Sequence, residues 1–249
     1  MLCPLSAETY VRFWLNKQKV KGVSLTNLTS SYTFLGVVGS HVKDVFSLLE
    51  AEYPGKNEYK RSEIGYASDI LTLQSHSMPL ESVLLCIESP FVIGVRQVLL
   101  DAGSKMRVAE VGTQVLDWLR VEEGIPAWGY EYGIGKIPFL GDISALSCEK
   151  NYFGKNAIMS AMESKENKEF LIHFTININT EENPWPWGGE PLCMDGCQVG
   201  RTTSVGYSYQ KNCHTGLGSI NSTLEFKYEP NLELVNVGQR FKVNILKIF

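Results

Sequence analysis

The sequence has no long apolar run and no concentrated basic stretch. None of its apolar stretches approaches the roughly 18 to 20 residues that a helix needs to cross a bilayer. Its formal net charge is −4 and its pI about 5.7, whereas a surface that binds nucleic acid needs clustered lysine and arginine. We therefore expect neither a membrane nor a nucleic acid among its partners.

Several cofactor and nucleophile motifs are absent as well. The stretch Gly133-Ile134-Gly135-Lys136 lacks the first glycine and the final hydroxyl residue of a phosphate-binding loop, so it predicts a turn. No Gly-x-Gly-x-x-Gly follows a predicted strand, so we expect no dinucleotide-binding unit, and hence no FAD, in this chain. A Gly-x-Ser-x-Gly nucleophile elbow is not present either.

The six cysteines do not have the spacing of a structural metal site. Cys193, Cys197, Cys213 and His214 come nearest, but zinc ligands commonly come as Cys-x2-Cys pairs, and the first pair here is spaced more widely. The adjacent Cys213 and His214 hinder each other from reaching one ion. The sequence therefore predicts ordinary thiols and no metal. Its N-terminus shows neither a secretory signal nor a transit peptide.

The composition is that of a folded chain, since 44% of the 249 residues are hydrophobic and 11% are aromatic. The apolar spacing predicts an α+β part over 1–168 and an antiparallel β module over 169–249. Alternation over 23–28 predicts a short strand. The other elements that the pattern predicts are helices at 8–19, 42–50, 90–102 and 110–123, and strands at 32–38, 70–73, 83–87 and 170–179.

Arg120 is the candidate ligand-binding residue that the residue types alone single out. It stands near the end of the predicted helix over 110–123, two residues before Glu122 and Glu123. Its planar guanidinium suits a carboxylate-bearing ligand. A salt bridge at the helix end is the alternative, and the sequence leaves both open.

The run Trp185-Pro186-Trp187-Gly188-Gly189-Glu190 is unusual, because two tryptophans with proline and glycine predict a rigid, apolar loop. Such a loop is able to stack on a flat heterocycle or to pack on a partner protein. Packing within its own chain is the alternative interpretation.

Short motifs also follow one another in order along nearly the whole chain. They are Leu28-Thr29-Ser30-Ser31-Tyr32, Val38-Gly39, Leu119-Arg120-Val121-Glu122-Glu123-Gly124, Trp128-Gly129, Tyr152-Phe153-Gly154-Lys155-Asn156-Ala157, Gly189-Glu190-Pro191, Asp195-Gly196, Val199-Gly200, Thr202-Thr203-Ser204-Val205-Gly206-Tyr207 and Gly238-Gln239-Arg240-Phe241. In this order they resemble the aminomethyltransferase (glycine cleavage T protein) family. The family's fold also forms the C-terminal half of sarcosine and dimethylglycine dehydrogenases and of the pyruvate dehydrogenase phosphatase regulatory subunit. The run Trp185-Pro186-Trp187-Gly188-Gly189-Glu190, which we call the tryptophan loop, is most similar to that regulatory subunit.

The resemblance implies an α+β, T-protein-like aminomethyltransferase fold, truncated at its N-terminus, with a C-terminal antiparallel β-barrel module. We expect a partial folate-binding domain over 1–168 and the barrel over 169–249. The cofactor-binding residues that it implies for tetrahydrofolate are Arg120, Glu81, Tyr32 and Trp187.

The departures from the family pattern bear on function. The family's catalytic aspartate lies in an early strand, and this chain is expected to begin downstream of it, so no residue here is assigned a catalytic role. The family's pterin-binding glutamate segment aligns with 77–82, where the glycines are gone and Glu81 is displaced by about one place. A second family acid is lost at Pro138-Phe139-Leu140-Gly141-Asp142. Only Arg120 stands where the motif expects a folate contact.

The resemblance therefore implies a mitochondrial protein of regulatory-subunit type, not an enzyme by itself, with a degraded folate site. Its expected partner is a phosphatase catalytic subunit or another protein. The alternative is the tetrahydrofolate-binding half of a flavin-dependent sarcosine- or dimethylglycine-type demethylating dehydrogenase, in which case the chain is an incomplete gene product.

Overall fold

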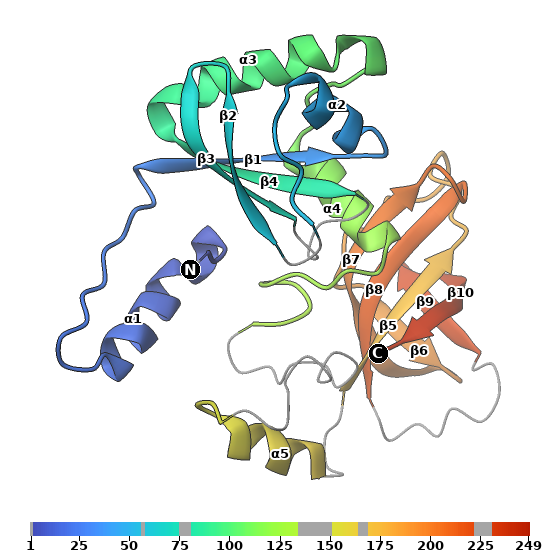
Figure 1. Cartoon of the computed structure of the whole chain (residues 1–249). Coiled ribbons are helices and arrows are strands. Elements are labelled where there is room, and N and C mark those ends of the chain that lie inside the picture. The colour runs from blue at the N-terminus through green and yellow to red at the C-terminus, as the bar shows by residue number, and fades with distance from the viewer. Residues whose placement is uncertain (1, 56–57, 75–80, 134–150, 164–168, 222–230) are drawn as a thin grey trace. The chain divides into compact units, whose positions relative to one another are not determined.

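A computed structural model describes residues 2–55, 58–74, 81–133, 151–163, 169–221 and 231–249 (Figure 1). The chain divides into two compact units, Met1–Thr113 and Gln114–Phe249. The sequence predicts a domain boundary after residue 168, and the first strand of the barrel begins at Glu169. The compact unit that contains the barrel begins earlier, at Gln114, and also includes the two helices before the barrel. The domain boundary at 168 stays a prediction.

The first unit contains one antiparallel sheet with strand order β1-β4-β3-β2. Along β1 and β4 the register pairs Tyr32 with Glu88 and Val38 with Ser82. The elements of this unit are α1 (Glu8–Gln18), β1 (Tyr32–Val38), α2 (Val42–Leu48), β2 (Tyr59–Ile64), β3 (Ala67–Gln74), β4 (Ser82–Glu88) and α3 (Val92–Ala102).

The core of the first unit follows from the alternation in β4. Val83, Leu85 and Ile87 are spaced by two residues, so they point to the same face of the sheet, and all three are buried. Phe46 of α2 and Val95 of α3 join the same buried cluster. The predicted helices and strands here are present, except at 23–28, where the alternating residues are exposed and form no strand.

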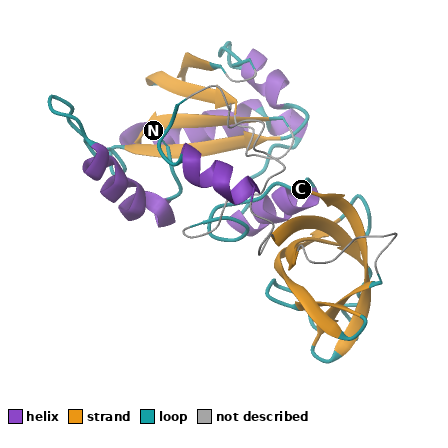
Figure 2. Ribbon diagram, turned by 90° about the horizontal axis from the view of Figure 1, so that it is seen from below, coloured by secondary structure: helices purple, strands orange, loops and turns teal. Residues whose placement is uncertain are grey.

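The second unit contains a closed barrel with strand order β10-β5-β8-β7-β6-β9 (Figure 2). The predicted fold, mixed α and β with a C-terminal antiparallel barrel, is confirmed. The elements of this unit are α4 (Thr113–Glu122), α5 (Lys155–Glu163), β5 (Glu169–Ile176), β6 (Pro191–Met194), β7 (Cys197–Ser208), β8 (Cys213–Asn221), β9 (Leu232–Asn236) and β10 (Gln239–Ile248).

The barrel interior is filled from alternate positions of β5. Ile172, Phe174 and Ile176 are fully buried and belong to one core cluster. Gly216 of β8 lies opposite Phe174, and a Cβ at this glycine would come within 2.4 Å of the phenyl ring. The glycine therefore leaves the space that the largest interior side chain of β5 occupies.

Across the described ranges, no helix is long and apolar enough to span a membrane.

Candidate functional site

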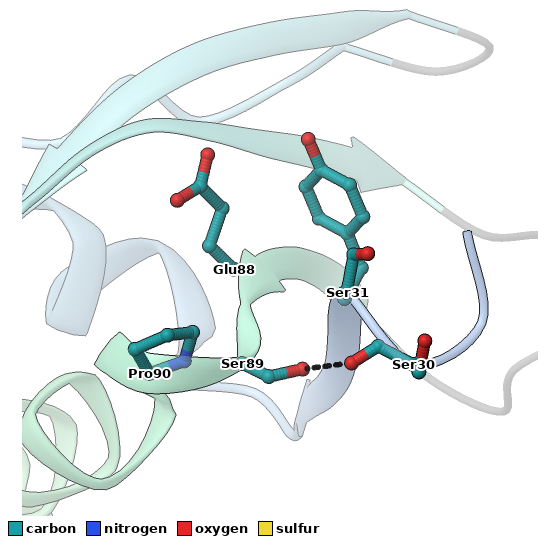
Figure 3. A pocket seen from close by; sticks show the side chains of 6 residues that line it. Ser30, Ser31, Glu88, Ser89 and Pro90 are labelled. Carbon is teal, nitrogen blue, oxygen red and sulfur yellow. Dashed lines mark hydrogen bonds between the residues drawn. The ribbon is translucent and has the colours of Figure 1, made fainter.

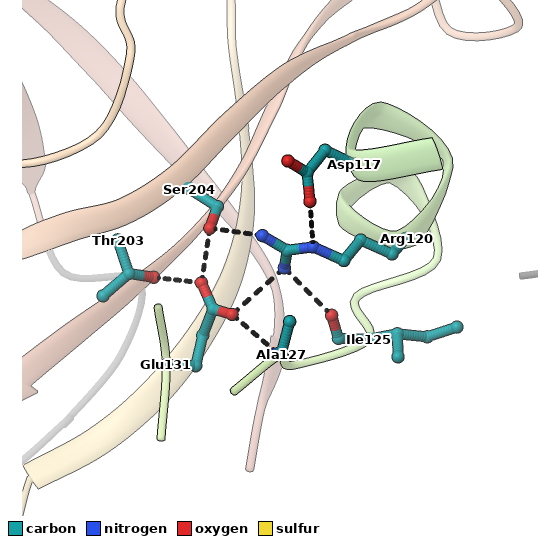
Figure 4. Close-up of polar contacts among 7 residues, drawn as sticks. All are labelled: Asp117, Arg120, Ile125, Ala127, Glu131, Thr203 and Ser204. Carbon is teal, nitrogen blue, oxygen red and sulfur yellow. Dashed lines mark hydrogen bonds and ion pairs between the residues drawn. The ribbon is translucent and has the colours of Figure 1, made fainter. Parts of the chain in front are cut away.

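Arg120 and Glu131 form a buried ion pair in the second unit (Figure 4). Arg120 Nη1 lies 3.0 Å from Glu131 Oε2, and the two side chains are 8% and 0% exposed. Arg120 is in the last turn of α4, and Glu131 follows in the loop after that helix. Each charge is removed from water and is compensated by the other.

The remaining donors of Arg120 are also engaged within the chain. Its Nε donates to Asp117 Oδ1 at 2.7 Å, its Nη1 to the Ile125 carbonyl at 3.3 Å and its Nη2 to Ser204 Oγ at 2.8 Å. The guanidinium carbon lies 4.8 Å from the centre of the Tyr130 ring. Four of the five N–H groups thus have protein acceptors. The salt bridge, one of the two roles that the sequence leaves open, is present, and ligand binding by Arg120 stays a prediction.

Glu131 accepts hydrogen bonds from several elements at once. The Ala127 amide donates at 2.8 Å, Thr203 Oγ1 at 2.7 Å and Ser204 Oγ at 2.6 Å. Ser204 accepts from Arg120 and donates to Glu131, so its hydroxyl joins the two charges. The cluster therefore fastens α4 and the following loop to β7.

The tryptophan loop is fixed by Glu190. Its carboxylate accepts hydrogen bonds from the Trp187 amide at 2.7 Å and from the Gly188 amide at 3.0 Å, and Thr202 Oγ1 also donates to it. Gly188 has a φ of 108°, and a Cβ there would lie 2.6 Å from the Thr203 carbonyl oxygen. A rigid loop, as the sequence predicts, is therefore present.

The two tryptophans of this loop have different surroundings. Trp185 stacks on Trp118 of α4, with ring centres 5.4 Å apart and planes 18° apart, and contacts His214 edge-on at 4.6 Å. Trp187 is 68% exposed. The interpretation of packing within the chain thus applies to Trp185, whereas Trp187 is accessible.

Two histidines in this unit are buried and neutral at pH 7. Burial and the nearby charge of Lys211 lower the pKa of His173 to about 4, against a hydrogen bond with the Val121 backbone that raises it. Its Nε2 lies 3.0 Å from Thr215 Oγ1. Burial likewise lowers the pKa of His214.

Tyr32, in the first unit, lines a pocket of about 400 Å³ at the start of β1 (Figure 3). Glu88, Ser89 and Pro90 line the same pocket, together with two further serines before the tyrosine. Ser89 Oγ donates to the Ser30 carbonyl at 3.3 Å. The pocket offers hydroxyl groups and one carboxylate to a polar ligand.

Glu81 is not part of that pocket. It precedes β4 at the end where Ser82 pairs with Val38, whereas Tyr32 is at the opposite end, paired with Glu88. Six residues of strand place these ends about 20 Å apart. The Glu81 carboxylate binds Lys43, so the structure does not bring the two predicted folate residues of this unit together.

Sequence reasoning missed Glu131, which is the central acceptor of the buried cluster. The available signal was a lone acid within the aromatic run Trp128-Gly129-Tyr130-Glu131-Tyr132. Two of the sequence motifs lie wholly or partly outside the described residues. They are the altered family segment at 138–142 and residues 134–136 of the stretch Gly133-Ile134-Gly135-Lys136. No group of three or more His, Cys, Asp or Glu in the described part of the chain is placed to hold a metal ion.

The comparisons with known proteins agree with this architecture. Residues 171–247 match the family described as "Glycine cleavage T-protein C-terminal barrel domain". The aminomethyltransferase T of the glycine cleavage system from Bartonella henselae has the same fold, with a TM-score of 0.69 and 17% identity. That match covers 87% of this chain and 58% of the bacterial chain. The predicted resemblance to the T-protein family is thereby confirmed.

Two curated relatives match almost the whole chain. The mitochondrial pyruvate dehydrogenase phosphatase regulatory subunit of Mus musculus is 25% identical over 252 residues, covering 96% of this chain. The mitochondrial dimethylglycine dehydrogenase of Homo sapiens is 24% identical over 249 residues, covering 94% of this chain. The chain spans only 29% and 26% of the length of these two relatives.

Proposed function

We propose that the protein is a non-catalytic, regulatory-subunit-like member of the T-protein family, and the match of residues 171–247 to the model of the family's C-terminal barrel domain supports this proposal. Its action is to bind a protein partner. The likeness to the phosphatase regulatory subunit over 96% of the chain supports this proposal. The mitochondrial relatives support a mitochondrial location.

The single observation that carries the proposal is the state of Arg120. It is the one usual folate contact that stands where the family motif expects it, and its guanidinium is committed to Asp117, Glu131 and Ser204. A folate carboxylate that took the place of Glu131 would leave this buried acid without its cationic partner, and this exchange would cost several kcal/mol, roughly 3 to 5.

The altered acids of the family pattern support a degraded folate site as well. Glu81 is paired with Lys43, and it lies far along the sheet from Tyr32. Each unpaired pterin donor would cost about 1 to 3 kcal/mol. Two such losses would weaken tetrahydrofolate binding by roughly two orders of magnitude or more.

A pull-down with the pyruvate dehydrogenase phosphatase catalytic subunit tests the proposal. We expect the chain to bind this subunit and to change the metal dependence of its phosphatase activity. Trp187→Ala is the variant to compare, because its side chain is exposed and its removal leaves the buried Arg120 cluster intact. The proposal fails if the wild-type chain neither binds the catalytic subunit nor alters its activity.

The second candidate function is the tetrahydrofolate-binding half of a flavin-dependent demethylating dehydrogenase. The likeness to dimethylglycine dehydrogenase over 94% of the chain favours it. Calorimetric titration with tetrahydrofolate separates the two functions. Micromolar binding that is weakened in Tyr32→Phe and Glu81→Gln would support the dehydrogenase function, and no binding at millimolar ligand would exclude it. These two exposed or half-buried sites are preferable to Arg120→Ala, which disrupts the buried cluster.

A further inference from the structure

The pocket at the start of β1 lies within the first unit, at one end of the β1–β4 strand pair. Tyr32 is the first residue of β1 and Glu88 the last of β4, and the register places them directly opposite each other. The side chains of such a pair lie on the same face of the sheet, with Cβ atoms about 5 Å apart. Since Ile87 points into the core, Tyr32 and Glu88 lie on the opposite face.

Hydrogen bonds between the two segments at the strand ends fix the walls of this pocket. The Ser89 amide donates to the Ser31 carbonyl at 2.9 Å, and the Ser89 hydroxyl donates to the Ser30 carbonyl at 3.3 Å (Figure 3). Pro90 follows, and its ring restricts the backbone further. A ligand therefore meets a pocket that is already formed, which reduces the entropic cost of binding.

Of the six described residues that line the pocket, Glu88 alone carries a charge. Its side chain is exposed and does not cap the helical turn that follows it. It forms an ion pair with no lysine or arginine in the described part of the chain. Arg61 of β2 interacts electrostatically with Tyr32, but its guanidinium is paired with Asp69. The pocket thus offers one uncompensated negative charge beside an aromatic ring.

We propose that this pocket binds an ammonium group, carried either by a small aliphatic amine or by a lysine side chain. An ammonium group is attracted both to a carboxylate and to the face of a tyrosine ring. Its three N–H donors also match the serine and tyrosine oxygens around Glu88. The volume of about 400 Å³ is within the usual range of small-molecule sites, roughly 300 to 1,000 Å³. This inference concerns the first unit alone and does not depend on the proposed function.

Two other classes of ligand fit the pocket less well. An anion would be attracted to the start of the helical turn at Ser89, but the carboxylate of Glu88 repels it. Calcium takes roughly six to eight oxygen ligands, usually with several carboxylates among them, and this pocket has one. An organic ammonium group needs only one carboxylate.

An NMR titration of the full chain, labelled with nitrogen-15, with n-butylamine at pH 7 and low salt tests the proposal. We expect saturable shifts in the amide signals of Ser31, Tyr32 and Ser89. The Kd should be on the order of millimolar, because an exposed charge pair and a cation–π contact each contribute little. The alcohol n-butanol has nearly the same size but no charge, so it should bind at least about fivefold more weakly. Added salt should weaken the binding of n-butylamine.

Glu88→Gln should weaken the binding of n-butylamine about three- to fivefold, and Tyr32→Leu about two- to fivefold. The matched controls are Glu63→Gln and Tyr66→Leu, which remove an exposed carboxylate and an exposed ring elsewhere in the first unit and should leave binding unchanged. The amide spectrum of each variant shows whether it is folded. The proposal is overturned if n-butylamine causes no saturable shift at these amides or if n-butanol binds equally well. Unchanged binding in Glu88→Gln or Tyr32→Leu, or equal weakening in the control variants, also overturns it.

A lysine peptide, acetyl-Gly-Lys-Gly-amide, distinguishes the two sources of the ammonium group. Tighter binding of this peptide than of n-butylamine supports a lysine side chain of a partner protein, and equal or weaker binding supports a free amine. The same peptide with acetyl-lysine keeps the shape and loses the charge, so it should bind at least about fivefold more weakly than the lysine peptide. If the lysine peptide binds and the acetylated peptide binds as well as it does, the ammonium group is not what the pocket recognises.

Discussion

Arg120 Nη1 and Glu131 Oε2 lie 3.0 Å apart in a buried site, and each side chain is bound by further groups of the second unit. A buried pair of this kind contributes little compared with a well-packed apolar pair, but the loss of one partner leaves an uncompensated charge. The pair therefore makes the attachment of α4 to the barrel sensitive to single substitutions.

Glu131→Gln should destabilise the protein by about 3 to 5 kcal/mol, because Arg120 keeps its charge and loses its buried partner. The free energy of unfolding in urea, followed by tryptophan fluorescence, measures this loss. Asp117→Asn is the matched control, since that carboxylate also binds Arg120 but is 43% exposed. The control should cost less than about 1 kcal/mol. Equal losses in the two variants would contradict the role of the buried pair.

Ser204→Ala should cost about 1 to 3 kcal/mol, because the hydroxyl both accepts from Arg120 and donates to Glu131. Thr203→Ser keeps the hydroxyl that donates to Glu131 and is expected to change the free energy of unfolding much less. A crystal structure of Ser204→Ala with an ordered water at the position of the hydroxyl would explain a smaller loss. A loss below that of Thr203→Ser would show that the bridging hydroxyl is unimportant.

Protonation of His173 should lower the stability of the protein as the pH falls. The pKa of this histidine is about 4 in the folded chain and 6.5 when unfolded, so the unfolded state binds the proton more tightly. The free energy of unfolding should be unaffected by this group above pH 6.5 and decrease between pH 6.5 and 4, by up to about 3 kcal/mol. In His173→Gln this part of the decrease should vanish. Parallel pH curves for the variant and the wild type would contradict it.

Two glycine substitutions should have opposite effects. Gly216→Ala brings a Cβ within 2.4 Å of the Phe174 ring and should destabilise the barrel by about 1 to 3 kcal/mol. Gly94 lies within α3, where a Cβ would meet nothing within 4 Å. Gly94→Ala should therefore stabilise the protein by up to about 1 kcal/mol. Thermal unfolding of both variants gives the comparison, and a stabilising Gly216→Ala would contradict the packing of the barrel interior.

The local patterns were sufficient to predict most of the fold. Alternation in 170–179 predicts β5, and helical spacing before Gly124 predicts α4, because in both cases one face of the element must be buried. The strand predicted at 23–28 is absent, because neither face of this segment is buried. Among the described residues no strand pairs with this alternating segment, so neither of its faces is covered, and Val23, Leu25 and Leu28 are exposed.

The candidate site was less predictable, because its contacts join residues that are distant in sequence. Arg120 can be recognised from its motif, but its contact with Ser204 spans 84 residues, and that of Glu131 with the same serine spans 73. Spacing along the chain gives no sign of either. The separation of Tyr32 from Glu81 likewise depends on the register of β1 and β4, which the sequence does not state.

The stacking of Trp118 on Trp185 has a consequence for spectroscopy. Two nearly parallel indoles with centres 5.4 Å apart share their electronic excitation, so their circular dichroism differs from that of isolated tryptophans. One indole belongs to α4 and the other to the loop before β6. The circular dichroism of this stacked pair therefore reports on the contact between α4 and the loop. We expect this signal to disappear when α4 separates from the barrel, even if every helix and strand stays folded.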